Sequence, residues 1–131
     1  MKATVSWQQA LTFSGKTESG FSQTLDGNGE TLSPMETVLL AVGACSSIDV
    51  VDILKKRRLT IHDCQCELEA ERAEEAPRVF TKIHAHYIVS GDNLKEKDVD
   101  RAVSLSAEKY CSVMLMLKGN VVITTSYTIV D

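Results

Sequence analysis

The chain has 131 residues, which is the size of one domain, and 44% of them are apolar, which excludes disorder over the whole chain. Its 14 basic and 18 acidic residues give a formal net charge of −4, which argues against broad nucleic-acid binding and against docking on an anionic membrane. The longest uncharged stretch, Thr37–Ile48, is too short to cross a membrane, and no apolar leader follows Met1. We therefore expect a cytoplasmic protein.

The first third of the chain is predicted to be rich in β-structure. Residues 4–12 alternate β-branched or aromatic residues with polar ones, and residues 21–25 resemble a returning strand. Between them, residues 14–20 have the composition of a turn. The strongest turn signal follows at residues 26–29, Asp-Gly-Asn-Gly, because all of these residues tolerate positive φ angles.

A long helix is predicted from Pro34 to about Arg57. Ser33 is a suitable N-cap, Pro34 fits the first helical position, and Glu36 stands three residues after the cap, as in a capping box. Apolar residues cover nearly every face of this helix, which predicts burial on all sides. Because one small core offers few partners to such a helix, the pattern also hints at dimerisation.

Two long strands, a second helix and a final strand are predicted next. The strands, residues 59–72 and 79–89, both alternate with period two and are expected to pair antiparallel. The second helix is expected as one continuous segment over residues 95–117, and the final strand covers residues 121–130. The predicted order is βββ-α-ββ-α-β, a single α+β domain over residues 1–131 with a mainly antiparallel sheet.

The four cysteines, Cys45, Cys64, Cys66 and Cys111, are the first candidates for chemistry. In a reducing compartment a stapling framework of disulfides is not expected, and a redox or metal-binding role is open. Cys45 lies in the first helix among small neighbours, and Cys111 lies in the second; either can also be a small apolar residue of the core. They could form a disulfide only if the fold brings them together.

Two further clusters contain residue types that bind metals. Cys64 and Cys66 share a strand face with His62, but their spacing fits a zinc site poorly, so we expect them in the strand core. His84 and His86 share a polar strand face, where a His-x-His pair can bind a metal; a solvated sheet surface is the plainer interpretation. We therefore predict no metal ion and no cofactor.

The chain resembles the OsmC/Ohr family of osmotically inducible and organic hydroperoxide resistance proteins. The resemblance rests on Ser33-Pro34-Met35-Glu36, on the apolar run from Leu39 to Cys45 with its continuation to Val51, and on residues 107–112, Ala-Glu-Lys-Tyr-Cys-Ser. It extends over essentially the whole chain. It implies an OsmC-like fold and an intertwined homodimer, in which two long central helices are wrapped by sheets from both subunits.

The resemblance also implies a thiol peroxidase. Cys45, as a thiolate, would attack an organic hydroperoxide and become a sulfenic acid, and Cys111 would condense with it to a disulfide that an external dithiol reduces. Such a site needs a cation and an acid near the reacting sulfur, and the resemblance assigns these roles to Lys16 and Glu36.

The chain departs from the family pattern at three positions. Lys16 stands where the peroxidases have an arginine. The peroxidases have a glutamate directly after the proline at the helix start, whereas this chain has Met35 there and Glu36 one residue later. Ser112 stands where they have a proline after the second cysteine. Lysine supplies charge but not the planar fork of donors of an arginine. The alternative hypothesis is therefore a non-catalytic homodimer with an apolar pocket at the subunit interface, either a small-ligand-binding protein or a stress-related, thiol-bearing scaffold.

Overall fold

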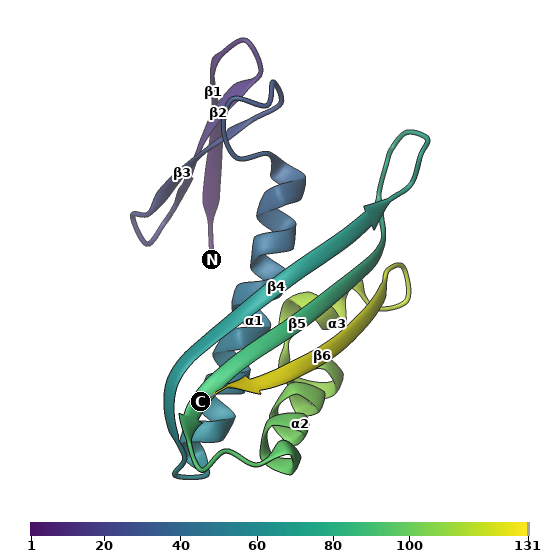
Figure 1. The fold of residues 1–131 in the computed structure, drawn as a ribbon. Helices are drawn as coiled ribbons and strands as arrows, with labels where there is room; N and C mark the ends of the chain where they lie inside the picture. Colours follow the sequence, from purple (N-terminus) through teal and green to yellow (C-terminus); the bar gives the residue numbers. More distant parts are fainter. Residues whose placement is uncertain (131) are drawn as a thin grey trace. The chain divides into compact units, whose positions relative to one another are not determined.

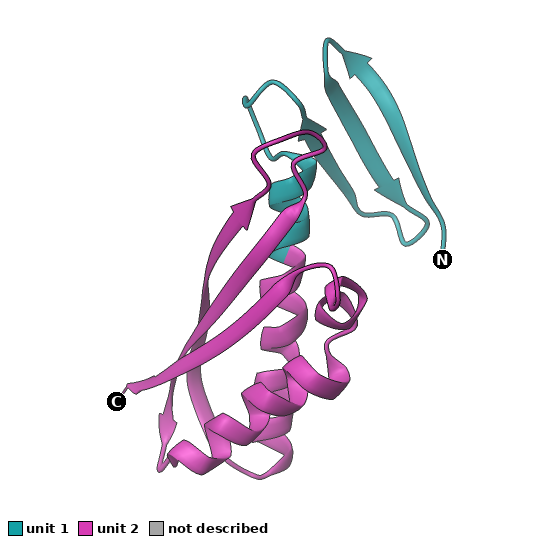
Figure 2. Ribbon diagram, turned by 90° about the vertical axis from the view of Figure 1, so that its right-hand side faces the viewer, with its two compact units in different colours: residues 1–40 teal, residues 41–131 magenta. Residues whose placement is uncertain are grey.

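The computed structural model describes residues 1–130 and divides into two compact units, Met1–Leu40 and Ala41–Asp131 (Figures 1 and 2). The first unit holds a three-stranded sheet, and the second holds another three-stranded sheet with helices. Helix α1, Pro34–Lys56, begins in the first unit and continues into the second. The chain is thus of mixed α+β class, with two sheets.

The sheet of the first unit is antiparallel, in the order β1 (Ala3–Gln9), β2 (Thr12–Thr17), β3 (Ser22–Asp26). The prediction of a turn over residues 14–20 is wrong for its first half, because β2 extends to Thr17. Gly15 lies in this central strand, opposite Val5 on one side and Gln23 on the other. Because β2 is hydrogen-bonded to β1 on one side and to β3 on the other, its backbone is extended although its sequence has the composition of a turn.

Helix α1 begins at the predicted residue with the predicted cap. The Ser33 amide donates to Glu36 Oε1 at 2.9 Å, and the Glu36 amide donates to Ser33 Oγ at 3.1 Å. These reciprocal hydrogen bonds form a capping box and satisfy two backbone donors at the helix start. The bonds between Ser33 and Glu36 confirm the helix start inferred from the sequence.

The prediction that α1 is buried on all sides is wrong for the single chain. The fully buried side of the helix is one stripe, formed by Val42, Gly43, Ser46, Val50 and Leu54. Leu40 is 55% exposed and Ile48 is 68% exposed. Length and composition alone would let α1 cross a membrane, a criterion that the core helix of a soluble protein also meets. In the chain as described, α1 packs on one side only.

The sheet of the second unit has the order β4 (Thr60–Arg72), β5 (Phe80–Asp92), β6 (Val122–Val130). The antiparallel pairing of β4 with β5 confirms the predicted strand pair. The pairing of β5 with β6 is parallel. Two parallel neighbours require a crossover connection, and the helical segment between β5 and β6 provides it.

That helical segment is not one continuous helix, so the prediction for residues 95–117 is wrong. It consists of α2 (Glu96–Leu105), a π-helical turn η1 (Ser106–Tyr110) and the short helix α3 (Ser112–Leu117). Between η1 and α3, Cys111 has an extended backbone with φ −74° and ψ 104°. The break therefore falls on one of the two candidate cysteines.

The helices of the second unit cover one face of its sheet (Figures 1 and 2). From β5, that face buries Ile83, Ala85, Tyr87 and Val89. Helix α1 crosses β4 closely, because a Cβ atom built on Gly43 would lie only 2.7 Å from Leu68 Cδ1. The absence of a side chain at Gly43 thus lets the helix approach the strand.

Candidate active site

The structure brings Cys45 and Cys111 together within the second unit. Cys45 lies on α1 and is partly exposed, whereas Cys111 is fully buried at the break before α3. The two side chains are neighbours, since Cys45 helps to raise the pKa of Cys111, and both are free thiols. A pair of reduced thiols in contact, one of them open to solvent, can be oxidised to a disulfide if the sulfurs approach to bonding distance.

The position of Cys111 follows from the break in the helical segment. Its amide donates to the Ser106 carbonyl at 2.8 Å, which closes the π-helical turn. Its sulfur accepts a hydrogen bond from the Met114 amide at 3.4 Å and so caps the start of α3. The sequence carries no Gly or Pro at this point, which explains why periodicity alone predicted a continuous helix.

The protonation state of Cys111 is set mainly by its burial. Burial raises the pKa of the Cys111 thiol from 9.0 to about 11, because the interior disfavours the thiolate. The Met114 amide partly offsets this shift, and the neighbouring Cys45 adds to it. Near neutral pH, Cys111 is therefore a protonated thiol that can donate its hydrogen.

A buried polar network next to the two cysteines ties α1 to β5 and to η1. The Tyr87 hydroxyl donates to Ser46 Oγ at 2.6 Å, and Ser46 Oγ donates to the Val42 carbonyl at 2.7 Å. The Ser106 hydroxyl donates to Asp49 Oδ2 at 2.9 Å. Sequence reasoning missed this network, although polar residues spaced by three inside an apolar helix were a signal for it.

Lys16 and Glu36 are described in the first unit, whereas Cys45 and Cys111 are described in the second. Lys16 is exposed on β2. Glu36 is exposed, and its carboxylate accepts the Ser33 amide; this hydrogen bond holds the pKa of Glu36 below its usual value. The Glu36 carboxylate therefore stays ionised near neutral pH. Their roles in the site remain predictions.

Cys64 and Cys66 lie on β4 beneath α1 and are half-buried, so the expectation of a strand core holds only in part. Burial raises the pKa of both thiols. The neighbouring Ser47 and Tyr87 side chains lower the pKa of Cys66 and partly offset the effect of burial. These contacts place Cys66 at the edge of the polar network, on its strand side.

An open cavity of about 520 Å³ adjoins the network on its helical side. Asp49, Arg57, Arg101 and Tyr110 are among its lining residues. Asp49 belongs to the network, and Tyr110 directly precedes Cys111. The cavity therefore reaches the polar network and the residue before Cys111, although neither cysteine is among its lining residues.

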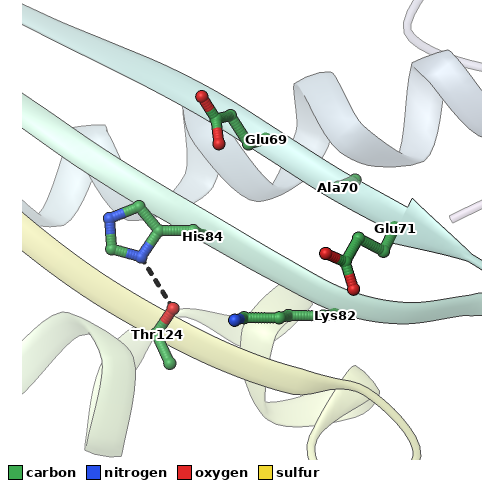
Figure 3. Close-up of a pocket in the computed structure, with 6 residues that line it drawn as sticks. All are labelled: Glu69, Ala70, Glu71, Lys82, His84 and Thr124. Atoms are coloured by element: carbon green, nitrogen blue, oxygen red, sulfur yellow. Dashed lines mark hydrogen bonds between the residues drawn. The ribbon is translucent and has the colours of Figure 1, made fainter.

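The outer face of the second unit's sheet is polar. Figure 3 shows a shallow cavity there, lined by Glu69, Ala70, Glu71, Lys82, His84 and Thr124. His84 and His86 are half-buried and are hydrogen-bonded to hydroxyl groups of β6, which agrees with the expected polar surface. Within residues 1–130, no three His, Cys, Asp or Glu side chains are already placed to hold a metal ion.

Comparison with known proteins places the chain in a family. Residues 27–126 match the family model described as OsmC-like protein. The chain is 54% identical to protein YhfA of Escherichia coli strain K12, over 99% of this chain and 98% of that protein. It is also similar to a crystal structure of a hypothetical protein from Aquifex aeolicus, with a TM-score of 0.90 and 34% identity over 98% of this chain and 95% of that one.

The chain belongs to the OsmC-like protein family. An organic hydroperoxide resistance protein OsmC from Legionella pneumophila shares the fold, with a TM-score of 0.74 over 97% of this chain and 95% of that one. Its sequence identity to this chain is only 16%, so this likeness concerns the fold alone. The family predicted from the helix start and the two cysteines is thereby confirmed.

Proposed function

We propose that this chain is a thiol-dependent reductase of organic hydroperoxides, or a related redox protein, with Cys45 and Cys111 as its reacting pair. The observation that carries the proposal is that the free thiols of Cys45, on α1, and Cys111, at the break before α3, are neighbours in the fold. The difference in their burial supports distinct roles, since the partly exposed Cys45 is accessible to a peroxide and the buried Cys111 is not.

The reaction balances with these two residues and an external dithiol. The Cys45 thiolate attacks one peroxide oxygen, the O–O bond breaks, and the alcohol leaves with a proton, so that Cys45 becomes a sulfenic acid. Cys111 then attacks the Cys45 sulfur, the S–S bond forms, and water leaves with the Cys111 proton. A dithiol reduces this disulfide by exchange and is itself oxidised.

We further propose, from the family resemblance, that Lys16 supplies the cation and Glu36 the acid of the reaction. We also propose that residues 1–131 act as a single domain in the cytoplasm. We propose that two chains form a homodimer through the open side of α1. The exposed Leu40 and Ile48 support this, because large apolar side chains on one helix face are stabilised when a partner covers them. Analytical ultracentrifugation of wild type and Ile48→Asp tests the assembly.

The peroxidase is tested with cumene hydroperoxide and a dithiol reductant. Wild type should turn over, Cys45→Ser should lose turnover, and Cys111→Ser should accumulate a sulfenic acid at Cys45 that a dimedone probe traps. Cys64→Ser is the matched control, because Cys64 is also a half-buried thiol but is not bonded to the pair. Absence of turnover in wild type, with all thiols still titratable, would refute the proposal.

One observation favours a second candidate, a non-catalytic homodimer that binds a small ligand. The Glu36 carboxylate is engaged in the capping box, which lowers its pKa and makes it a poorer proton donor to a leaving alkoxide. For such a protein, Cys45→Ser should leave the affinity for a ligand unchanged. A large loss of affinity in that variant would count against this candidate.

A further inference from the structure

The outer face of the β4–β5–β6 sheet carries two imidazoles that converge on one oxygen atom. His84 Nε2 lies 2.8 Å from Ser126 Oγ, and His86 Nδ1 lies 2.6 Å from the same atom. The two residues alternate along β5 with the buried core residues, so both rings stand on the face opposite the helices. Histidines that bind one metal ion also direct an imidazole nitrogen each at a shared point.

The second nitrogen of each imidazole ring, which does not contact Ser126, is hydrogen-bonded to a threonine hydroxyl of β6. His84 Nδ1 lies 2.6 Å from Thr124 Oγ1, as Figure 3 shows, and His86 Nε2 lies 3.0 Å from Thr128 Oγ1. Histidines that ligate metals almost always donate their second ring N–H to an acceptor, which fixes the tautomer and the ring orientation. The threonine hydroxyls of β6 can accept in this way, and each ring then presents a lone pair to the shared point.

The shared hydroxyl cannot serve both rings in that tautomer. Ser126 has one hydrogen, so it can donate to only one of the two near nitrogens. In the metal-free protein one ring must therefore donate to Ser126 and take the other tautomer. A cation that takes the place of the Ser126 hydroxyl, with that side chain rotated away, would accept both lone pairs at once and let both rings donate outward, to Thr124 and Thr128.

Two carboxylates that can supply oxygen ligands lie on the neighbouring strand, β4. Glu67 is opposite His86 and Glu69 is opposite His84 in the β4–β5 register, and facing side chains in such pairs lie within reach of each other. Both glutamates are exposed and form no ion pair with any of residues 1–130, so either carboxylate is able to swing toward the rings. Nearby, Lys82 faces Glu71 rather than these two.

We propose that His84 and His86, with a carboxylate from Glu67 or Glu69, bind a divalent first-row transition metal of the Zn²⁺ type on the outer sheet face. Imidazole and carboxylate together suit Zn²⁺, Ni²⁺ and Cu²⁺ rather than Mg²⁺ or Ca²⁺. This site is built by β4, β5 and β6 alone and is independent of the redox function proposed above.

The test is a Zn²⁺ titration of the reduced protein by isothermal calorimetry. Wild type should bind one ion per chain, and His84→Gln and His86→Gln should each weaken binding about tenfold or more, as the loss of one of two imidazole ligands requires. His62→Gln is the matched control: it removes the remaining histidine of the sequence, which is exposed and bonded to Asp92 on another part of the sheet. This variant should bind like wild type.

The four free thiols are the competing ligands, and Co²⁺ distinguishes them. A cobalt complex of the imidazole site should lack the strong near-ultraviolet absorption that thiolate ligands give, and the signal of the complex should be lost in the His84→Gln/His86→Gln double variant. Three results overturn the proposal: no Zn²⁺ binding to wild type, binding that the double variant retains, or a thiolate band in the wild-type complex. Circular dichroism establishes that each variant is folded.

Discussion

The Ser106 hydroxyl donates a hydrogen bond of 2.9 Å to Asp49 Oδ2, and this contact joins the turn that precedes one candidate cysteine to the helix that carries the other. The Ser106 carbonyl accepts the Cys111 amide, and Asp49 stands one helical turn after Cys45. Ser106 and Asp49 therefore hold the two sulfurs at a fixed relative position.

Replacing Ser106 should weaken the coupling between the two cysteines. We expect Ser106→Ala to lower the free energy of unfolding by about 1 kcal/mol, because the half-buried Asp49 carboxylate loses the hydrogen bond from the buried Ser106 hydroxyl. The equilibrium between the dithiol and the Cys45–Cys111 disulfide, measured against dithiothreitol, should also shift toward the dithiol. The nearby Ser104→Ala is the control, and an equal effect there would contradict a specific role for Ser106.

Removal of the Tyr87 hydroxyl should cost stability without creating a large cavity. Tyr87→Phe deletes the donor of the 2.6 Å bond to Ser46, and we expect a loss of about 1 kcal/mol in urea denaturation. Tyr127 has no side-chain hydrogen bond to residues 1–130, so Tyr127→Phe should be nearly neutral. If the two variants lose the same stability, the Ser46 contact contributes nothing.

The pKa of Cys111 predicts a loss of stability in alkaline solution. The folded-state pKa of about 11 lies above the ordinary value of 9.0, so between these pH values the unfolded chain has released a proton that the folded chain keeps. The contribution of Cys111 to stability is therefore complete below pH 9 and declines as the pH rises toward 11. Denaturation of wild type and Cys111→Ala across this range should show a shallower decline in the variant.

A side chain at residue 43 requires the end of the Leu68 side chain to shift. A Cβ atom at residue 43 would lie 2.7 Å from Leu68 Cδ1, so we expect Gly43→Ala to destabilise the protein by about 1–3 kcal/mol despite the better helix propensity of alanine. Adding Leu68→Ala should recover part of that loss, which a double-mutant cycle by thermal denaturation measures. If the stability losses of the two single variants simply add in the double variant, helix α1 moves away from β4 instead.

The capping box makes a separate prediction for Glu36. If its carboxylate serves only the helix start, Glu36→Gln keeps the hydrogen bond to the Ser33 amide and should leave peroxide turnover unchanged, while Ser33→Ala should cost about 1 kcal/mol of stability. A loss of turnover in Glu36→Gln with unchanged stability would instead support its proposed role as the acid. Stopped-flow kinetics and thermal denaturation separate the two outcomes.

Local chemistry allowed several elements to be predicted from the sequence. The Ser33–Glu36 cap and the alternation along β4 and β5 depend on neighbouring residues, and both are confirmed. The break at Cys111 could not be predicted, because it is set by a sulfur acting as a helix cap and by distant partners of Ser106. The contact between Cys45 and Cys111 likewise depends on tertiary packing, which no spacing in the sequence encodes.

The parallel pairing of β5 with β6 has a consequence for the order of folding. Residues that share this pairing are 40 positions apart, as in the contact between His84 and Thr124, whereas β4 and β5 are joined by a short connection. Closing the longer loop costs more entropy and slows the formation of its contacts. We therefore expect the β4–β5 hairpin to form before the β5–β6 pairing that gives the two histidines their hydroxyl partners.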